Sequence, residues 1–170
     1  MIIVLEGPDG VGKSTLIEYL EKNIFNDTIK FKFSDKSNIM FEDYKTVLDS
    51  KNNLLIDRFN LSEDVYSTIY NRMPKNSLLD HLKTFSLINE KNVLYFILYS
   101  SDLNLLVSRC HKRGDTKKVY DNLEKLNNYY YLIGKELEKL YPDNIILIDI
   151  FESNFYEKIE SIIKRRLINE

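Results

Sequence analysis

Residues 7–15, which read GPDGVGKST, combine glycines, a lysine and two hydroxyl side chains at the spacing G-x-x-x-x-G-K-S/T. Glycines let successive backbone N–H groups turn inward, where they can surround a phosphate. Lys13 can reach the β- and γ-phosphates of a nucleotide, and the Ser14 hydroxyl can bind Mg²⁺. The stretch therefore predicts a site for a nucleoside triphosphate and its metal ion. The alternative is a chance match in an ordinary glycine turn.

A second charged centre begins at Asp57 and Arg58, directly after the short apolar run Leu54–Ile56. Such a run is typical of a buried parallel strand, and ligands bind at the carboxyl ends of these strands in open α/β sheets. Ser62 and Tyr66 follow on the next predicted helix. We therefore expect Asp57 and Arg58 to face a ligand. The alternative is a structural ion pair at the end of the strand.

Both motifs need a sheet that carries them on one edge, and the hydrophobic pattern of the chain predicts one. Short apolar or alternating runs predict strands near 2–5, 28–33, 54–58, 93–99 and 144–150. Amphipathic stretches predict helices near 13–25, 39–50, 61–71, 77–90, 103–112, 119–140 and 153–167. Five strands separated by helices favour an α/β fold with three layers, in which helices cover both faces of a parallel sheet.

Two of these segments carry more detailed predictions. The helix near 77–90 has an apolar set that we expect to be buried, namely Leu78, Leu79, Leu82, Phe85, Leu87 and Ile88. The stretch 113–118 reads as a short, highly charged connector between two helices.

Size and composition indicate a single domain over residues 1–170. The formal net charge is -2, so nothing favours bulk binding to nucleic acid or to a membrane. No apolar run approaches the ~20 residues of a membrane helix. One cysteine, Cys110, fits a reducing compartment, and no signal peptide is recognisable before the first strand. We therefore expect a cytoplasmic protein.

The stretch DRFNLSEDVYS at 57–67 resembles the signature D-R-Y/H/F-x-x-S-x-x-A-Y-Q of the thymidylate kinase family of P-loop nucleoside monophosphate kinases. The first motif resembles that family's P-loop, E-G-x-D-G-x-G-K-S/T, with Asp9 in place. A looser similarity joins YFILYSSDLNLLVSRCHKRGD to the family's fourth strand, the helix after it and an arginine-rich lid. The resemblance implies the strand order 2-3-1-4-5 and a short lid at about 113–118.

The same resemblance implies an activity: ATP-dependent phosphorylation of a deoxynucleoside monophosphate, with dTMP as the leading acceptor and Mg²⁺ as cofactor. It implies a set of ATP-binding residues, namely Gly7, Asp9, Gly10, Val11, Gly12, Lys13, Ser14, Thr15 and Arg109. It places the metal ion on Ser14 and Asp57. Members of the family are commonly homodimers, so a homodimer is a further expectation.

For the acceptor, the resemblance implies that Arg58 binds its phosphate, Asp9 its 3′-hydroxyl and Tyr66 its sugar, with Ser62 and Phe41 completing the pocket. The catalytic arginine of the family lies either in the P-loop or in the lid. Gly10 occupies the P-loop position here, so the lid should supply the charge that phosphoryl transfer requires. The candidates are Arg109, Arg113, Lys117 and Lys118, with Lys13, Arg58, Arg113 and Lys117 forming the implied catalytic set. The alternative for the lid cations is a solvated charged turn.

Two departures keep other functions open. The family's Arg-Glu-Pro-Gly-Gly motif after strand two is missing, because residues 31–34 read FKFS, and Ser67 replaces the final Gln of the signature. A deoxynucleoside kinase is the first alternative, and it would need a carboxylate base near the end of strand two. Asp35 is the candidate for that base. The second alternative is a nucleotide-binding module without catalysis.

Overall fold

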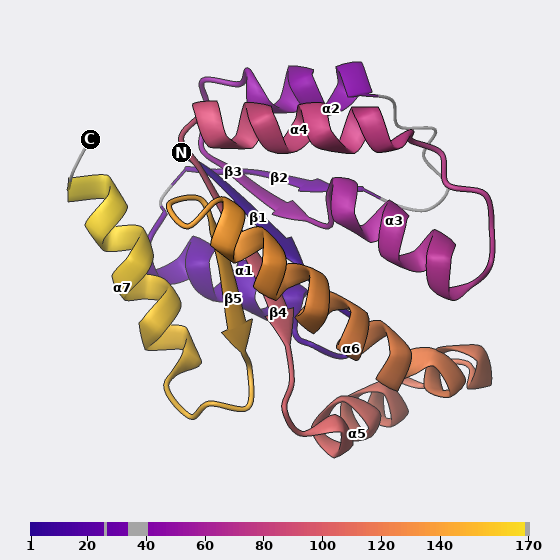
Figure 1. Ribbon diagram of the computed structural model, residues 1–170. Coiled ribbons are helices and arrows are strands. Elements are labelled where there is room, and N and C mark those ends of the chain that lie inside the picture. The colour runs from indigo at the N-terminus through magenta and orange to yellow at the C-terminus, as the bar shows by residue number, and fades with distance from the viewer. Residues whose placement is uncertain (26, 34–40, 169–170) are drawn as a thin grey trace.

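The computed structural model describes residues 1–25, 27–33 and 41–168. Its centre is a parallel sheet of five strands in the order β2-β3-β1-β4-β5 (Figure 1). The strands are β1 (Ile2–Glu6), β2 (Ile29–Lys32), β3 (Leu54–Asp57), β4 (Val93–Tyr99) and β5 (Ile145–Asp149). This arrangement confirms the predicted sheet and its order.

Seven helices of the described residues surround the sheet and confirm the three-layer prediction. They are α1 (Lys13–Asn23), α2 (Phe41–Leu48), α3 (Asn60–Ile69), α4 (Leu78–Glu90), α5 (Leu103–Arg113), α6 (Lys117–Leu140) and α7 (Phe155–Ile168). Helices α2, α3, α4 and most of α6 share one apolar core with the sheet, while α1, α5 and α7 share the other. In Figure 1, α2 and α4 lie side by side on the first of these faces.

Alternate residues of each central strand enter these two cores. In β1, Ile2 and Val4 belong to one core, whereas Ile3 and Leu5 belong to the other. Every residue of β1 is buried, because parallel strands covered on both faces have no solvent side. The unbroken apolar runs of the sequence are the direct result of this double burial.

The prediction for the buried face of α4 is wrong for three of its six residues. Leu78, Leu79 and Leu82 have exposed fractions of 74%, 58% and 55%, whereas Phe85 and Ile88 are buried as predicted. The remaining buried positions of α4 are polar, namely His81 and Thr84. Thr84 donates from its hydroxyl to the Asp80 carbonyl at 2.8 Å, so its polar atom is satisfied within the helix. The prediction considered apolar residues only, and it therefore missed the two buried polar positions of the helix.

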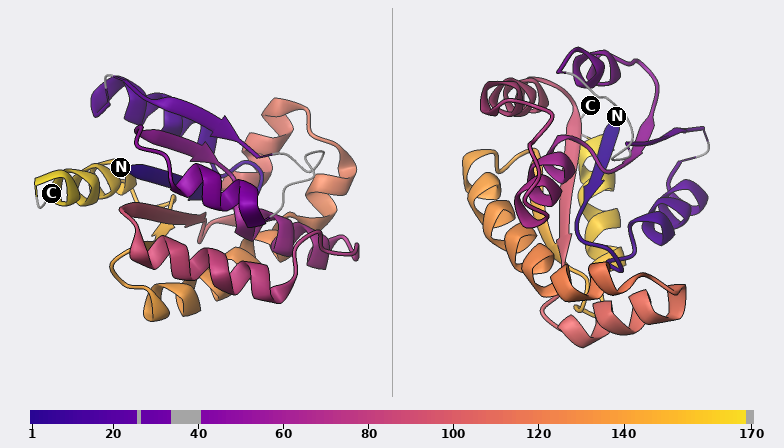
Figure 2. Two further views of the ribbon diagram at one scale, coloured as in Figure 1. Left: turned by 90° about the horizontal axis from the view of Figure 1, so that it is seen from above. Right: turned by 90° about the vertical axis from the view of Figure 1, so that its right-hand side faces the viewer.

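The charged connector is shorter than predicted. Helix α5 ends at Arg113, where Gly114 takes a left-handed conformation, and α6 begins at Lys117. Only 114–116 lie between the helices, so the predicted lid cations at its ends are helical. Figures 1 and 2 show α5 and the start of α6 beyond the carboxyl ends of the strands, while the rest of α6 runs back along the sheet. Among the residues described, no helix is long and apolar enough to cross a membrane.

Candidate active site

The candidate site lies where β1 and β3 end side by side. Leu5 of β1 pairs with Asp57 of β3, so the segments that follow both strands leave the sheet at the same edge. The loop 7–12 leaves β1, and Arg58 follows β3. Because both motifs emerge from neighbouring central strands, the sheet brings together two groups that are about fifty residues apart in the sequence.

Gly10 shows why the loop requires glycine. Its φ of 78° is left-handed, and a Cβ there would lie 2.8 Å from the Cys110 sulfur and 2.9 Å from the Leu106 carbonyl oxygen. Helix α5 is thus packed directly against the loop. An arginine at this position would require α5 to move, which supports the expectation that positive charge comes from elsewhere.

The Lys13 side chain is buried and points back into the loop. Its ammonium donates to the carbonyls of Gly7 and Pro8 at 2.8 and 2.9 Å. Burial, followed by the nearby Arg58 charge, lowers the pKa of Lys13 from 10.5 to about 7. Phosphate oxygens in the loop would oppose both effects, because they favour the charged ammonium.

ATP binding is therefore expected to take up protons above about pH 7. The free protein loses the Lys13 proton as the pH passes its lowered pKa, whereas phosphate keeps the lysine charged in the complex. The dissociation constant for ATP should rise with pH, by up to about tenfold per unit. Calorimetry in buffers of different ionisation enthalpy measures the proton uptake. A Lys13→Arg variant, which stays charged, should lose this pH dependence, and proton release by the wild type would contradict the prediction.

Arg109 of α5 lies over the loop that holds Lys13. Its Nη1 approaches the carbonyl oxygens of Gly10 and Val11, each at 3.4 Å. Ser14 and Thr15 are exposed at the first turn of α1, on the open side of the loop. The predicted ATP-binding residues therefore surround one loop at the N-terminus of a helix, a geometry suited to phosphate.

The two predicted metal ligands are adjacent. The Ser14 hydroxyl lies 3.5 Å from Oδ2 of Asp57, and Lys32 donates to the same oxygen at 2.7 Å. The other oxygen of Asp57, Oδ1, is buried and has no hydrogen-bond partner among the described residues. A hydroxyl beside a carboxylate with an unused oxygen fits Mg²⁺, which binds few protein oxygens and keeps its water and phosphate ligands.

Arg58 lies between the loop and a cavity. It has a left-handed φ of 70°, and its Nη2 donates to Oδ1 of Asp9 at 2.7 Å. The Tyr66 hydroxyl donates to the other Asp9 oxygen at 2.9 Å, and burial raises the pKa of Tyr66 so that the donor proton is retained. The Arg58 guanidinium also stacks 4.7 Å from the centre of the Tyr66 ring. Three residues of the predicted acceptor site thus form one connected group.

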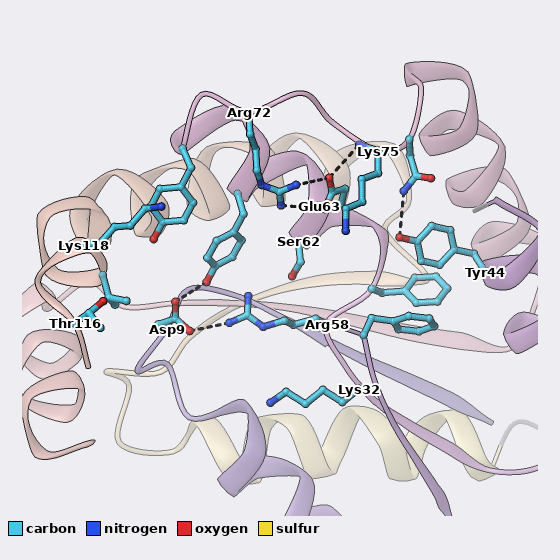
Figure 3. A pocket seen from close by; sticks show the side chains of 16 residues that line it. Asp9, Lys32, Tyr44, Arg58, Ser62, Glu63, Arg72, Lys75, Thr116 and Lys118 are labelled. Atoms are coloured by element: carbon cyan, nitrogen blue, oxygen red, sulfur yellow. Dashed lines mark hydrogen bonds and ion pairs between the residues drawn. The ribbon is translucent and has the colours of Figure 1, made fainter. Parts of the chain in front are cut away.

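The cavity beside Arg58 has a volume of about 500 Å³ and is more cationic than acidic. Its basic lining residues are Lys32, Arg58, Arg72, Lys75 and Lys118, while its acidic ones are Asp9 and Glu63. Phe33, Tyr44 and Phe59 provide an aromatic wall with ring centroids 4.6–5.6 Å apart. Figure 3 shows Arg72 paired with Glu63 across the cavity from Lys32. This lining suits a flat, negatively charged ligand.

Two predicted residues lie apart from this cavity. Phe41 begins α2 and is not among the lining residues; the Lys83 ammonium lies 5.4 Å from its ring centre. Lys117 is exposed at the start of α6, whereas Lys118 lines the cavity and lies over the Tyr70 ring at 4.6 Å.

Arg113 and Ser62 are near the site but have protein partners. Arg113 pairs with Asp115 at 2.9 Å and lies 3.9 Å from Asp9. Ser62 lines the cavity, and its hydroxyl is bonded to Glu6 and lies 3.0 Å from the Tyr130 hydroxyl. A ligand could recruit Arg113 by replacing Asp115.

Sequence reasoning did not single out Glu6, which is the last residue of β1 and is fully buried. Its carboxylate accepts from the backbone N–H groups of Phe59 and Ser62 at 2.7 and 3.0 Å. The hydroxyls of Tyr95 and Tyr130 approach it at 3.3 and 3.4 Å. The sequence offered one signal for this role, namely a charged residue at the end of an apolar strand. A carboxylate buried at such a position needs several hydrogen-bond donors from the protein.

Comparisons with known proteins agree with this architecture. The model of a family described as the KAP family P-loop domain matches residues 1–163. No curated protein matches the chain. The YorR protein from Bacillus subtilis, solved with phosphorylated GDP, is 21% identical with a TM-score of 0.72, over 99% of this chain and 97% of that one.

Two kinases have a similar structure. A deoxyadenosine kinase from M. mycoides, solved with products dCMP and a flexible dCDP, is 19% identical with a TM-score of 0.59, over 100% of both chains. A shikimate kinase from Acinetobacter baumannii, solved with shikimate, is 12% identical with a TM-score of 0.56, over 99% and 94%. At these identities the similarity shows the fold alone, which is that of P-loop kinases.

Proposed function

Because this chain belongs to the KAP family of P-loop domains and has the fold of P-loop kinases, we propose that it is an ATP-dependent kinase. Its acceptor in this proposal is a deoxynucleoside monophosphate. Among such acceptors, the resemblance of residues 57–67 to the thymidylate kinase signature favours dTMP.

The observation that carries the proposal is the position of the Arg58 guanidinium. It donates to Asp9 of the phosphate-binding loop at 2.7 Å, and it lines the cationic cavity. A phosphate bound to Arg58 would thus lie beside the loop that holds the donor phosphates. Phosphoryl transfer depends mainly on such positioning and on charge neutralisation.

In this mechanism the loop amides and Lys13 bind the ATP phosphates, and Arg58 binds the phosphate of the acceptor. Asp9 accepts from the 3′-hydroxyl of the sugar, and Tyr66 packs against the sugar ring. Arg113 at the lid neutralises charge on the moving phosphoryl group, and Lys117 contributes from the same end of α6. Ser14 and Asp57 would hold Mg²⁺, which supplies further charge neutralisation there.

The main alternative is a deoxynucleoside kinase, because a structural neighbour carries that name. A nucleoside acceptor requires a carboxylate that removes the proton of its 5′-hydroxyl. At the end of β2 the cavity contains Lys32, whose ammonium is paired with Asp57 at 2.7 Å. Lys32 thus supplies a cation at the end of β2, not the carboxylate that this alternative requires. Asp35, the candidate base from the sequence, lies outside the described residues.

The proposal is tested by ADP release from ATP and Mg²⁺ with a panel of acceptors: dTMP, dUMP, dCMP, dAMP, dGMP, thymidine and deoxyadenosine. We expect turnover with at least one monophosphate and none with the nucleosides. A Lys13→Ala preparation serves as the blank for contaminating kinases. Turnover with nucleosides alone would move the protein to the alternative class, and no turnover would favour a nucleotide-binding module.

A further inference from the structure

Arg58 needs support from the protein, because its backbone conformation is unfavourable for a residue with a side chain. A left-handed φ of 70° is uncommon outside glycine and asparagine. Its own N–H donates to the Leu5 carbonyl at 3.0 Å, and the next N–H, of Phe59, donates to Oε1 of Glu6 at 2.7 Å. Both hydrogen bonds come from the end of β1, so β1 fixes the backbone on each side of Arg58.

Glu6 also caps the helix that follows Arg58. The N-cap residue of α3 is Phe59, whose side chain cannot accept a hydrogen bond. Oε1 of Glu6 accepts from the N–H of Ser62, the third residue of α3, at 3.0 Å. A carboxylate at a helix N-terminus also interacts favourably with the helix dipole. The N-terminus of α3 is therefore capped by Glu6 of β1 rather than by the side chain of its own N-cap residue.

The second oxygen of Glu6 joins α6 to the same group. Oε2 accepts from the Ser62 hydroxyl, which lies 3.0 Å from the Tyr130 hydroxyl. Burial, followed by the charge of Glu6, raises the pKa of Tyr130 well above its usual value, so its hydroxyl remains a donor. One carboxylate, placed directly before the phosphate-binding loop, is therefore bonded to both α3 and α6.

We propose that Glu6 is a positioning residue for the acceptor phosphate: by binding the N–H groups of Phe59 and Ser62 it holds Arg58 in the left-handed conformation that directs the guanidinium to the cavity. The proposal rests on the proposed function, and it assigns Glu6 no contact with either substrate. Loss of the carboxylate should therefore weaken use of the acceptor while leaving the ATP loop in place.

The test is a double-mutant cycle between Glu6→Gln and Arg58→Ala. We expect Glu6→Gln to raise the KM for the acceptor about tenfold, since a hydrogen bond to a charged group is altered, with little change in the KM for ATP. In the Arg58→Ala background the same change should add less than about twofold, because the two residues act as a unit. Independent, additive effects would overturn the proposal.

The control is Asn144→Ala, at the opposite edge of the sheet. Asn144 is buried, and its amide donates to the carbonyls of Ile88 and Val93 at 3.1 and 3.0 Å. Its loss should lower the thermal midpoint without changing the KM for the acceptor, which separates positioning from general destabilisation. If Glu6→Gln does not fold, Tyr130→Phe replaces it, with a smaller rise in the same KM expected and an unchanged KM counting against the proposal.

A readout without substrate separates this inference from the proposed function. The side-chain N–H signals of Arg58 in ¹⁵N NMR should report a held guanidinium in the wild type and a mobile one in Glu6→Gln. If the wild type phosphorylates no acceptor, the proposed function fails while the NMR signals still decide whether Glu6 positions Arg58. Unchanged signals in the variant would overturn the inference even in an active kinase.

Discussion

Replacement of Lys13 by alanine is expected to remove turnover, with kcat falling by roughly 10²–10³-fold or more, as for loss of a transition-state donor. The ammonium is held inside the loop, where it contacts the carbonyls of Gly7 and Pro8. When phosphates enter, it can exchange these carbonyls for the β- and γ-oxygens, where negative charge develops during transfer. Coupled ADP release at saturating ATP and acceptor measures the effect.

The fold should survive this substitution. The Lys13 ammonium contacts two loop carbonyls and no carboxylate at ion-pair distance among the described residues, so the substitution breaks no salt bridge. Circular dichroism and the thermal midpoint check this point. Lys22→Ala, at the exposed end of the same helix, is the matched control and should retain full activity. If the Lys13 variant kept more than about a tenth of the wild-type activity, the loop would not be part of the catalytic site.

Arg58→Ala is expected to reduce kcat/KM for the acceptor by about 10²-fold or more, the size of a charge-assisted hydrogen bond to phosphate. The Arg58 side chain is only 19% exposed, so water cannot replace the guanidinium effectively. Its loss also leaves Asp9 with only Tyr66 as a side-chain donor at hydrogen-bond distance among the described residues. The acceptor should therefore lose both its phosphate ligand and an ordered partner for its sugar.

Kinetics with one substrate varied at a time identify which site was damaged. The KM for ATP should stay within about threefold in Arg58→Ala, whereas the acceptor KM rises. Arg58→Lys should recover part of the loss, because lysine retains the charge without the paired N–H groups. Arg165→Ala on α7 is the control for removing an arginine. A rise confined to the KM for ATP would show that Arg58 serves the donor instead.

The sheet and the two charged motifs could be predicted because each depends on local sequence. Buried parallel strands give unbroken apolar runs, and the residues directly after them must lie at the carboxyl edge. Asp57 and Arg58 were therefore found from their place after one such run, and the structure puts them beside the loop. Their partner Asp9 lies within the loop motif itself.

The positions that failed depend on tertiary contacts. Leu78, Leu79 and Leu82 satisfy a helical pattern but face away from the sheet, since the packing of α4 follows Phe85 and Ile88. Phe41 was expected from the family resemblance and stays a prediction, while the aromatic wall of the cavity is formed by residues from β2–α2, α2 and the β3–α3 junction. The sequence around Glu6 does not indicate which groups donate hydrogen bonds to its carboxylate, because these groups lie on α3, β4 and α6.

The contacts of Glu6 also have a consequence for the order in which the site forms. Its donors Ser62 and Tyr130 are 56 and 124 residues away in the sequence. The phosphate-binding loop is synthesised before these donors, yet β1 lies between β3 and β4 and cannot complete its pairing until both have been made. A nascent chain that ends before residue 130 therefore has Glu6 and Ser62 but lacks the Tyr130 hydroxyl that joins α6 to them. Contacts of such large sequence separation slow folding, so we expect the link between Glu6 and α6 to form after the nearer contacts of Glu6 with α3.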